Sequence, residues 1–233
     1  MKAVVYNKKA KPDRLVYCDV EKQAPKPAGL SFEEAAAMPM ASMTALQALR
    51  NKGNIREGQE VLILGSSGGV GSMTIQLARH FGVVITAVCS TRNVEQTRSL
   101  GADRVIDYTK ENFAAGDRKY DLIVAVNGNY SLLKCRKALK PDGRYVMVGG
   151  ALSQIFKAIV IGKPLSLGRR KMLFLAAKTN SDDLKYLLNL ASHGIIRPAI
   201  DRFFTPETTA EAMQYAAGGH AQGKVVIKWS TTG

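Results

Sequence analysis

The residues with the clearest potential for chemistry form a glycine-rich stretch in the first third of the chain. An apolar run at 61–64 leads into Gly65, Gly68 and Gly71, and an amphipathic run follows. This order predicts a buried strand, a tight turn and a helix. The first N–H groups of a helix lack backbone partners and lie at the positive end of its dipole, which suits a diphosphate. The candidate diphosphate turn is Ser67, Gly68, Gly69, Val70 and Gly71.

The spacing of these glycines leaves two interpretations open. Their expected roles are a positive φ, a close approach of backbone to ligand, and close packing of helix on strand. Gly65-x-x-Gly68-x-x-Gly71 departs from the commoner G-x-G-x-x-G, so an ordinary strand–helix turn that binds nothing is the alternative. A second predicted strand, 83–89, follows directly, and this context favours a dinucleotide site.

The end of that second strand indicates which dinucleotide is bound. An acidic residue about 20 positions past the glycines would bind the ribose 2′-hydroxyl of NAD. The chain instead has Ser90, Thr91, Arg92 and Asn93 there. Hydroxyls and a guanidinium offer hydrogen bonds and positive charge to a 2′-phosphate, so NADP(H) is favoured over NAD. The alternative, compatible with the first, is that Ser90 or Asn93 caps a helix and Arg92 is solvated.

Composition limits the remaining possibilities. The 233 residues are 46% hydrophobic and 22% charged, which suits one globular domain or one plus a small appendage. No apolar run reaches the roughly 18 residues of a transmembrane helix. The N-terminus, 1–6, is typical of a strand and not of a signal peptide. A soluble cytoplasmic protein without a membrane partner is therefore predicted.

Metal and nucleic-acid binding are not favoured. The three cysteines and three histidines are scattered, and no pair of Cys, His, Asp or Glu has metal-ligand spacing, so no zinc site is expected. The net charge of +14 could attract nucleic acid, but the 33 Lys and Arg are spread along the chain. A positive field that attracts an anionic cofactor is the milder interpretation.

Alternating strands and helices position these residues. A parallel α/β sheet wound on both sides, a Rossmann fold, is predicted, with ligands at the carboxyl ends of its strands. Before the glycine turn we expect a hairpin (2–6 and 14–20), a capped helix from Ser31 interrupted at Pro39, and a helix over 40–51. After it we expect helix 94–100, strand 104–108, strand 120–126, helix 131–139, strand 144–148, strand 172–176, helix 182–192 capped by Ser181, extended 195–203, helix 206–217 capped by Thr205, and strand 224–229.

Six segments carry a family resemblance over nearly the whole chain: 2–6 (KAVVY), 30–39 (LSFEEAAAMP), 44–49 (TALQAL), 65–71 (GSSGGVG), 101–108 (GADRVIDY) and 223–227 (GKVVI). The sequence resembles the medium-chain dehydrogenase/reductase superfamily, which includes alcohol dehydrogenases, in its zinc-independent, quinone oxidoreductase-like (zeta-crystallin-like) branch. The resemblance implies an NADPH-dependent oxidoreductase that transfers hydride to a quinone, an enone or another activated carbonyl or alkene, such as an aldehyde or ketone. It also implies a homodimer formed through an edge strand at 171–177.

The resemblance assigns further residues to a cofactor site. Besides the diphosphate turn, it implies a 2′-phosphate clamp of Ser90 with Arg92 or Asn93. It places Tyr108 near the adenosine ribose, Thr44 near the nicotinamide, and Asn127, Gly128 and Gly149 along the cleft. No residue is identified as catalytic. Tyr6, Tyr17 and Lys224 are candidate proton donors, each more simply explained as structural.

One departure from the family affects the whole organisation. Family members carry a GroES-like β-barrel where residues 21–29 join the hairpin directly to the next helix, so roughly 80–100 residues, a small domain, are missing. The predicted domains are 1–27, a hairpin remnant with its connector, and 28–233, the dinucleotide-binding domain with the last strand. The hairpin and last strand could pair, because bare edges are a liability. A shortened NADP(H)-binding protein with little turnover is the alternative function, and an RNA-binding side activity is a weaker one.

Overall fold

A six-stranded parallel sheet forms the centre of the molecule. The computed structural model describes residues 2–6, 15–19, 29–126, 130–149, 169–219 and 221–229. The strand order is β5-β4-β3-β6-β7-β8, and every neighbouring pair is parallel. These strands are β3 (Glu60–Leu64), β4 (Val84–Cys89), β5 (Arg104–Asp107), β6 (Tyr120–Val126), β7 (Leu139–Val148) and β8 (Lys171–Leu175). The predicted Rossmann fold is confirmed.

Helices cover both faces of this sheet, which explains the continuous apolar runs of its central strands. Alternate residues of β3 enter different cores: Val61 and Ile63 one, Leu62 and Leu64 the other. The first core is completed by α1 (Phe32–Leu46), α2 (Gly69–His80) and α6 (Ser181–Ser192), and the second by α4 (Leu132–Ala138). Burial on both faces is the condition under which parallel strands become apolar at every position.

The predicted interruption of the first helix at Pro39 is wrong. Helix α1 begins with the expected capping box, in which Ser31 Oγ accepts from Glu34 N at 3.0 Å and Ser31 N donates to Glu34 Oε2 at 2.8 Å. It continues through Pro39 to Leu46, and one π-helical segment, η1 (Gln47–Lys52), follows. A proline costs about 3 kcal/mol inside a helix. Near-complete burial of the neighbouring Met38 and Ala41 offsets that cost.

The last strand also differs from expectation. A parallel two-stranded sheet joins β9 (Ile200–Phe204) to β10 (Lys224–Ile227), with η3 (Pro206–Thr208) and α7 (Thr209–Ala217) between them. The predicted hairpin forms from β1 (Lys2–Tyr6) and β2 (Leu15–Asp19), and these strands pair with each other. The expected pairing of hairpin and last strand is therefore not present among the described residues. Each strand pairs with the strand nearer to it in sequence, β1 with β2 and β9 with β10, since closing a shorter loop costs less conformational entropy.

Smaller corrections concern the ends of elements. Asn180, and not Ser181, caps α6, because its Oδ1 accepts from Asp182 N and Asp183 N, both at 2.9 Å. Strand β7 already begins at Leu139, opposite Tyr120. The predicted helix 94–100 is η2 (Thr91–Asn93) followed by α3 (Val94–Ser99). No helix among the described residues has the length and apolar character needed to span a membrane.

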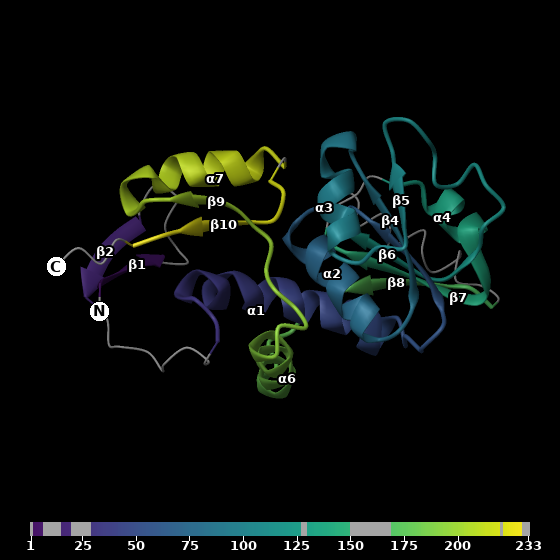
Figure 1. The fold of residues 1–233 in the computed structure, drawn as a ribbon, viewed down its shortest axis with the longest axis horizontal. Coiled ribbons are helices and arrows are strands. Elements are labelled where there is room, and N and C mark those ends of the chain that lie inside the picture. The colour runs from purple at the N-terminus through teal and green to yellow at the C-terminus, as the bar shows by residue number, and fades with distance from the viewer. Residues whose placement is uncertain are drawn as a thin grey trace.

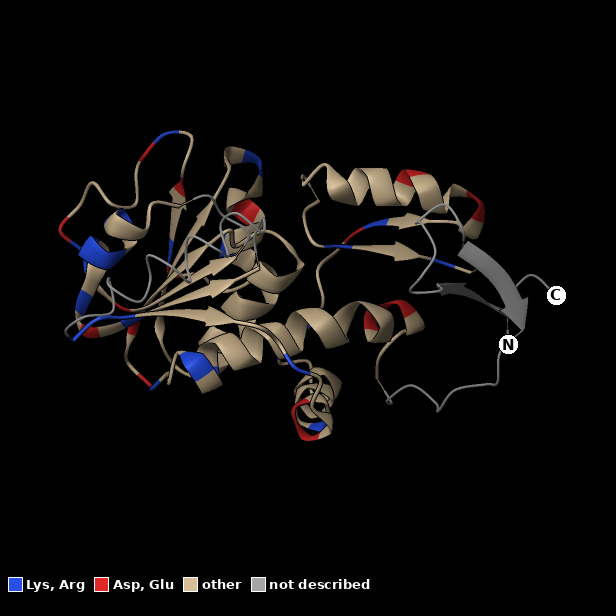
Figure 2. Ribbon diagram, turned by 180° about the vertical axis from the view of Figure 1, so that it is seen from behind, with Lys and Arg blue, Asp and Glu red and all other residues tan. Residues whose placement is uncertain are grey.

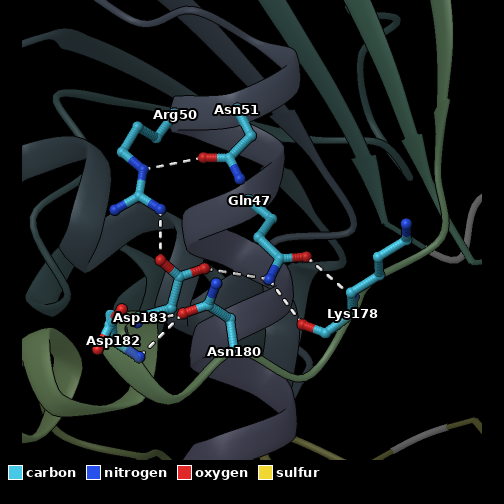
Figure 3. Close-up of polar contacts among 7 residues, drawn as sticks. All are labelled: Gln47, Arg50, Asn51, Lys178, Asn180, Asp182 and Asp183. Atoms are coloured by element: carbon cyan, nitrogen blue, oxygen red, sulfur yellow. Dashed lines mark hydrogen bonds and ion pairs between the residues drawn. The ribbon is translucent and has the colours of Figure 1, made fainter.

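Helix α1 lies alongside both the helices of the six-stranded sheet and the β9–α7–β10 unit (Figure 1), since it contacts α2, α6 and β10. A buried carboxylate joins its continuation to α6 (Figure 3). Asp183, 6% exposed, accepts from Gln47 Nε2 at 3.1 Å and from Arg50 Nη2. Gln47 also donates to Lys178 O at 2.7 Å and accepts from Lys178 N at 3.0 Å. Burial opposes ionisation of Asp183, but the hydrogen bonds from Arg50 and Gln47 lower its pKa below the ordinary value.

Candidate functional site

A cavity of about 990 Å³ opens at the carboxyl ends of four sheet strands. It is lined by residues at the ends of β3, β4, β5 and β6, at the start of α2, in α1 and β10, and in the α7–β10 connection. Figure 1 shows the β9–α7–β10 unit beside this end of the sheet. The position is the one expected for ligands of open α/β sheets.

The glycines of the predicted diphosphate turn have different surroundings. Gly65 has φ +76°, and a Cβ added there would lie 2.2 Å from Val126 O. A Cβ on Gly71 would lie 2.2 Å from Gly65 O, so α2 and the turn pack too closely for any side chain. A Cβ on Gly68 would have no neighbour within 4 Å. The fold therefore requires Gly65 and Gly71, whereas Gly68 leaves open space beside the cavity.

The start of α2 faces this space without a side-chain cap. Its N-cap is Gly68, which makes no side-chain hydrogen bond, and Gly68, Gly69 and Val70 all line the cavity. The first N–H groups of a helix have no partner within it. The aliphatic stem of Lys224 crosses this point, because its Cδ lies 2.6 Å from the position of a Cβ on Gly69. Backbone donors and a lysine thus lie on one side of the cavity, an arrangement suited to a doubly charged anion.

The loop after β4 forms the neighbouring wall. Ser90, Thr91, Arg92 and Asn93 all line the cavity. Ser90 and Asn93 occupy the N-cap positions of η2 and α3, as the capping alternative predicts, but neither makes a side-chain capping bond there. Asn93 is instead buried, and its Nδ2 donates to Ser90 Oγ at 3.0 Å.

An acidic residue that the sequence did not single out lies behind this loop. Asp107, at the end of β5, accepts from Thr91 Oγ1 at 2.6 Å and from Thr109 Oγ1 at 2.7 Å. The Thr91 hydrogen bond, followed by those from Thr109, holds the Asp107 pKa below its ordinary value. The carboxylate joins the loops after β4 and β5. A signal exists in the sequence, because Asp107 is the residue before the last one of the predicted strand 104–108.

The structure brings eight of the thirteen predicted cofactor residues to one cavity. Thr44 is buried in α1, where its Oγ1 donates to Met40 O at 2.7 Å, and Met40 and Ala41, one turn away, line the cavity. Gly71 is buried within α2, and Gly149 is exposed after β7. Asn127 and Gly128 lie outside the described residues, as do the side chains of Tyr6 and Tyr17. The cavity-lining eight are Ser67, Gly68, Gly69, Val70, Ser90, Arg92, Asn93 and Tyr108.

Several lining residues were missed as binding residues. Tyr130 packs edge-on against Phe113, with ring centroids 5.9 Å apart, and burial raises its pKa to about 12. From the sequence, Lys224 is a candidate proton donor only. These residues are distant in sequence from the glycine turn, so no local spacing relates them to it. The others are Met40, Ala41, Cys89, Thr109, Val126, Gly219 and Ala221, whereas the lining residues Gly65 and Thr91 already belong to the predicted turn and strand end.

Comparison with known proteins identifies the family. The profile described as zinc-binding dehydrogenase matches residues 100–227, more than half of the chain. The chain belongs to this zinc-binding dehydrogenase family. The predicted resemblance to medium-chain dehydrogenases/reductases is thereby confirmed. Among the described residues of this zinc-binding dehydrogenase family member, no group of three or more His, Cys, Asp or Glu could hold a metal ion.

The relatives of this family member are longer proteins. It is 38% identical over 218 residues to the 2-methylene-furan-3-one reductase of Solanum lycopersicum. It is 35% identical over 218 residues to the chloroplastic NADPH-dependent alkenal/one oxidoreductase of Arabidopsis thaliana. Each match covers 91% of this chain and 51% of the relative. The quinone oxidoreductase of Coxiella burnetii superposes with a TM-score of 0.77 at 30% identity, over 94% of this chain and 66% of that one.

Proposed function

We propose that the chain binds NADP(H) in this cavity and takes part in hydride transfer to an enone, a quinone or a related carbonyl compound. The observation that carries the proposal is the cavity itself, where an uncapped helix start and the Ser90–Asn93 loop meet at the strand ends. The names of the plant and bacterial relatives support the same chemistry. Bound NADPH would supply the hydride, and the chain's residues would hold and orient the cofactor.

In this proposal the two phosphate groups of NADP(H) have separate binding sites. The diphosphate lies against the start of α2, at Ser67, Gly68, Gly69 and Val70, with the Lys224 ammonium beside it. The 2′-phosphate lies at the Ser90–Asn93 loop, with Tyr108 near the ribose. The placement of Thr44 near the nicotinamide, and of Asn127, Gly128 and Gly149 along the cleft, remains a prediction from the family resemblance.

Lys224 provides a test of the diphosphate site. We expect Lys224→Met to weaken binding of both NADPH and NADH about tenfold, because the diphosphate common to both loses one charge-assisted hydrogen bond. Fluorescence or calorimetric titration would measure both affinities. Lys228→Met is the matched control, since Lys228 Nζ contacts Glu33 Oε1 at 3.1 Å and does not line the cavity. Unchanged affinities in Lys224→Met would remove the lysine from the site.

Turnover distinguishes an enzyme from a protein that only binds the cofactor. The purified chain would be mixed with NADPH and a panel of enones, quinones, aldehydes and ketones, and NADPH oxidation followed by its absorbance. The proposal predicts substrate-dependent oxidation. Binding without oxidation would favour the alternative of a shortened NADP(H)-binding protein.

RNA binding has less support, because Lys and Arg are distributed over many elements and interspersed with acidic residues (Figure 2).

Three further features belong to the same proposal. A homodimer would form through β8, an edge strand whose outer backbone groups have no neighbour within the sheet of the described chain. The region between the hairpin of 1–27 and the domain of 28–233 would lack the family's GroES-like barrel, in keeping with the partial coverage of the relatives. The location would be cytoplasmic.

A further inference from the structure

We infer that Gln222 is a positioning residue that fixes the direction of the Ser90 hydroxyl proton and thereby favours NADPH over NADH. The inference rests on the proposed function, because it concerns the 2′-phosphate end of that cavity. Gln222 lies in the connection between α7 and β10, outside the cavity lining, and it acts through two residues that do line the cavity, Asn93 and Ser90.

The side-chain amide of Gln222 has only one workable orientation. Its Nε2 lies 2.7 Å from Asn93 Oδ1 and 3.4 Å from Arg92 O. A backbone carbonyl accepts hydrogen bonds and cannot donate them, so this end of the amide is the NH₂ group. The backbone carbonyl of Gln222 itself accepts from Gln96 Nε2 at 2.7 Å. The residue is therefore held against α3 and η2 by both its main chain and its side chain.

This orientation determines that of Asn93. Because Asn93 Oδ1 accepts from Gln222, the Asn93 NH₂ group must lie at the other end, where it donates to Ser90 Oγ at 3.0 Å. Asn93 is only 4% exposed, so water cannot readily replace either partner. Hydrogen-bond donation therefore runs in one direction, from Gln222 to Asn93 and from Asn93 to Ser90. We call these three residues the relay.

The end of this relay is a donor beside the cavity. The Ser90 hydroxyl already accepts a hydrogen bond from Asn93, so its proton is available for an acceptor in the cavity that Ser90 lines. A phosphate presents acceptor oxygens, and hydrogen bonds to ionised acceptors are stronger than neutral ones. The ribose hydroxyl of NADH is a neutral partner that can also donate, so it gains less from this arrangement. The relay consequently favours the phosphorylated cofactor.

Gln222→Met tests the relay with little change of shape at a half-buried position. Without the Gln222 donor, the Asn93 amide can turn over and accept the Ser90 proton, which withdraws the donor from the cavity. We expect NADPH affinity to fall about tenfold, the loss of one hydrogen bond to a charged group, while NADH affinity changes by less than about twofold. Calorimetric titration with each cofactor would measure the ratio, and circular dichroism would verify folding.

Two comparisons separate positioning from simple support of the loop. Gln96→Met removes the hydrogen bond from α3 to the Gln222 main chain but leaves the side-chain hydrogen bonds of Gln222, Asn93 and Ser90 intact, and should leave the NADPH-to-NADH ratio unchanged. In a Ser90→Ala background, Gln222→Met should produce no further loss of preference, because its effect passes through that hydroxyl.

The possible outcomes are distinct. A wild-type chain that binds neither cofactor overturns the proposed function and the relay together. A wild type that prefers NADPH, with Gln222→Met retaining that preference or weakening both cofactors equally, overturns the relay and leaves the proposed function standing. A selective loss for NADPH that disappears in the Ser90→Ala background supports it.

Discussion

Replacing Gly71 with alanine is expected to lower the free energy of unfolding by about 3 kcal/mol, at the upper end of the usual cost of overpacking. The added Cβ would lie 2.2 Å from Gly65 O and 2.7 Å from the Ser66 backbone. Neither contact is with a flexible side chain, so relief requires α2 to move away from β3. Urea unfolding followed by circular dichroism would measure the change.

Gly68→Ala is the matched control for this prediction. Gly68 has φ −76° and ψ 176°, a conformation open to any residue, and a Cβ there meets nothing within 4 Å. The free energy of unfolding of Gly68→Ala should therefore remain close to that of the wild type. Equal unfolding midpoints for Gly71→Ala and the wild type would contradict the close packing of the turn against its own helix.

Asp183→Ala is expected to destabilise the protein by about 2–3 kcal/mol. The substitution removes the acceptor of Arg50 and of one Gln47 hydrogen bond in the network of Figure 3. This expected loss of stability is smaller than that for a fully buried ion pair, because the Arg50 side chain is 43% exposed and partly screened by solvent. Chemical denaturation would measure it. Asp182→Ala is the control, since that neighbouring carboxylate is 85% exposed and should matter little.

The same carboxylate gives a prediction for acidic pH. The Asp183 pKa is lowered on folding, so its stabilising contribution is complete above the unfolded pKa and is lost as pH falls through the lower folded pKa. The difference in unfolding free energy between wild type and Asp183→Asn should accordingly shrink with acidification, since a protonated carboxyl resembles the amide. Denaturation series at neutral and acidic pH would measure this. A difference that stayed constant would show that ionised Asp183 contributes nothing.

The sheet was predictable because its signals are local. Each strand is an apolar run followed by a turn, and each helix has a capping residue or an amphipathic pattern, as at Ser31 and Thr205. The errors arose where distant contacts outweigh local preference. Burial of α1 overrides Pro39, and β10 pairs with β9 and not with the hairpin.

The residues of the candidate site likewise fall into those predicted from local sequence and those placed only by contacts between distant segments. The glycine turn and the Ser90 loop were found because both follow strands whose carboxyl ends share an edge. Lys224 and Gln222 could not be assigned to the cofactor site, since only the tertiary fold brings the start of β10 to Gly69 and the α7–β10 connection to Asn93. Thr44 was placed in the right helix, but its hydroxyl is bound to Met40 O. The family resemblance thus points to the region of α1 beside the cavity, whereas Met40 and Ala41 are the α1 residues that line it.

The most direct test of cofactor binding is calorimetric titration of the purified chain with NADPH and, separately, with NADH. We expect saturable binding of NADPH and clearly weaker binding of NADH, because the strand end at Ser90 carries hydroxyls and Arg92 where an NAD site would carry an acid. Absence of binding to both would contradict the account, and the glycine turn would then serve only to pack α2 on the sheet.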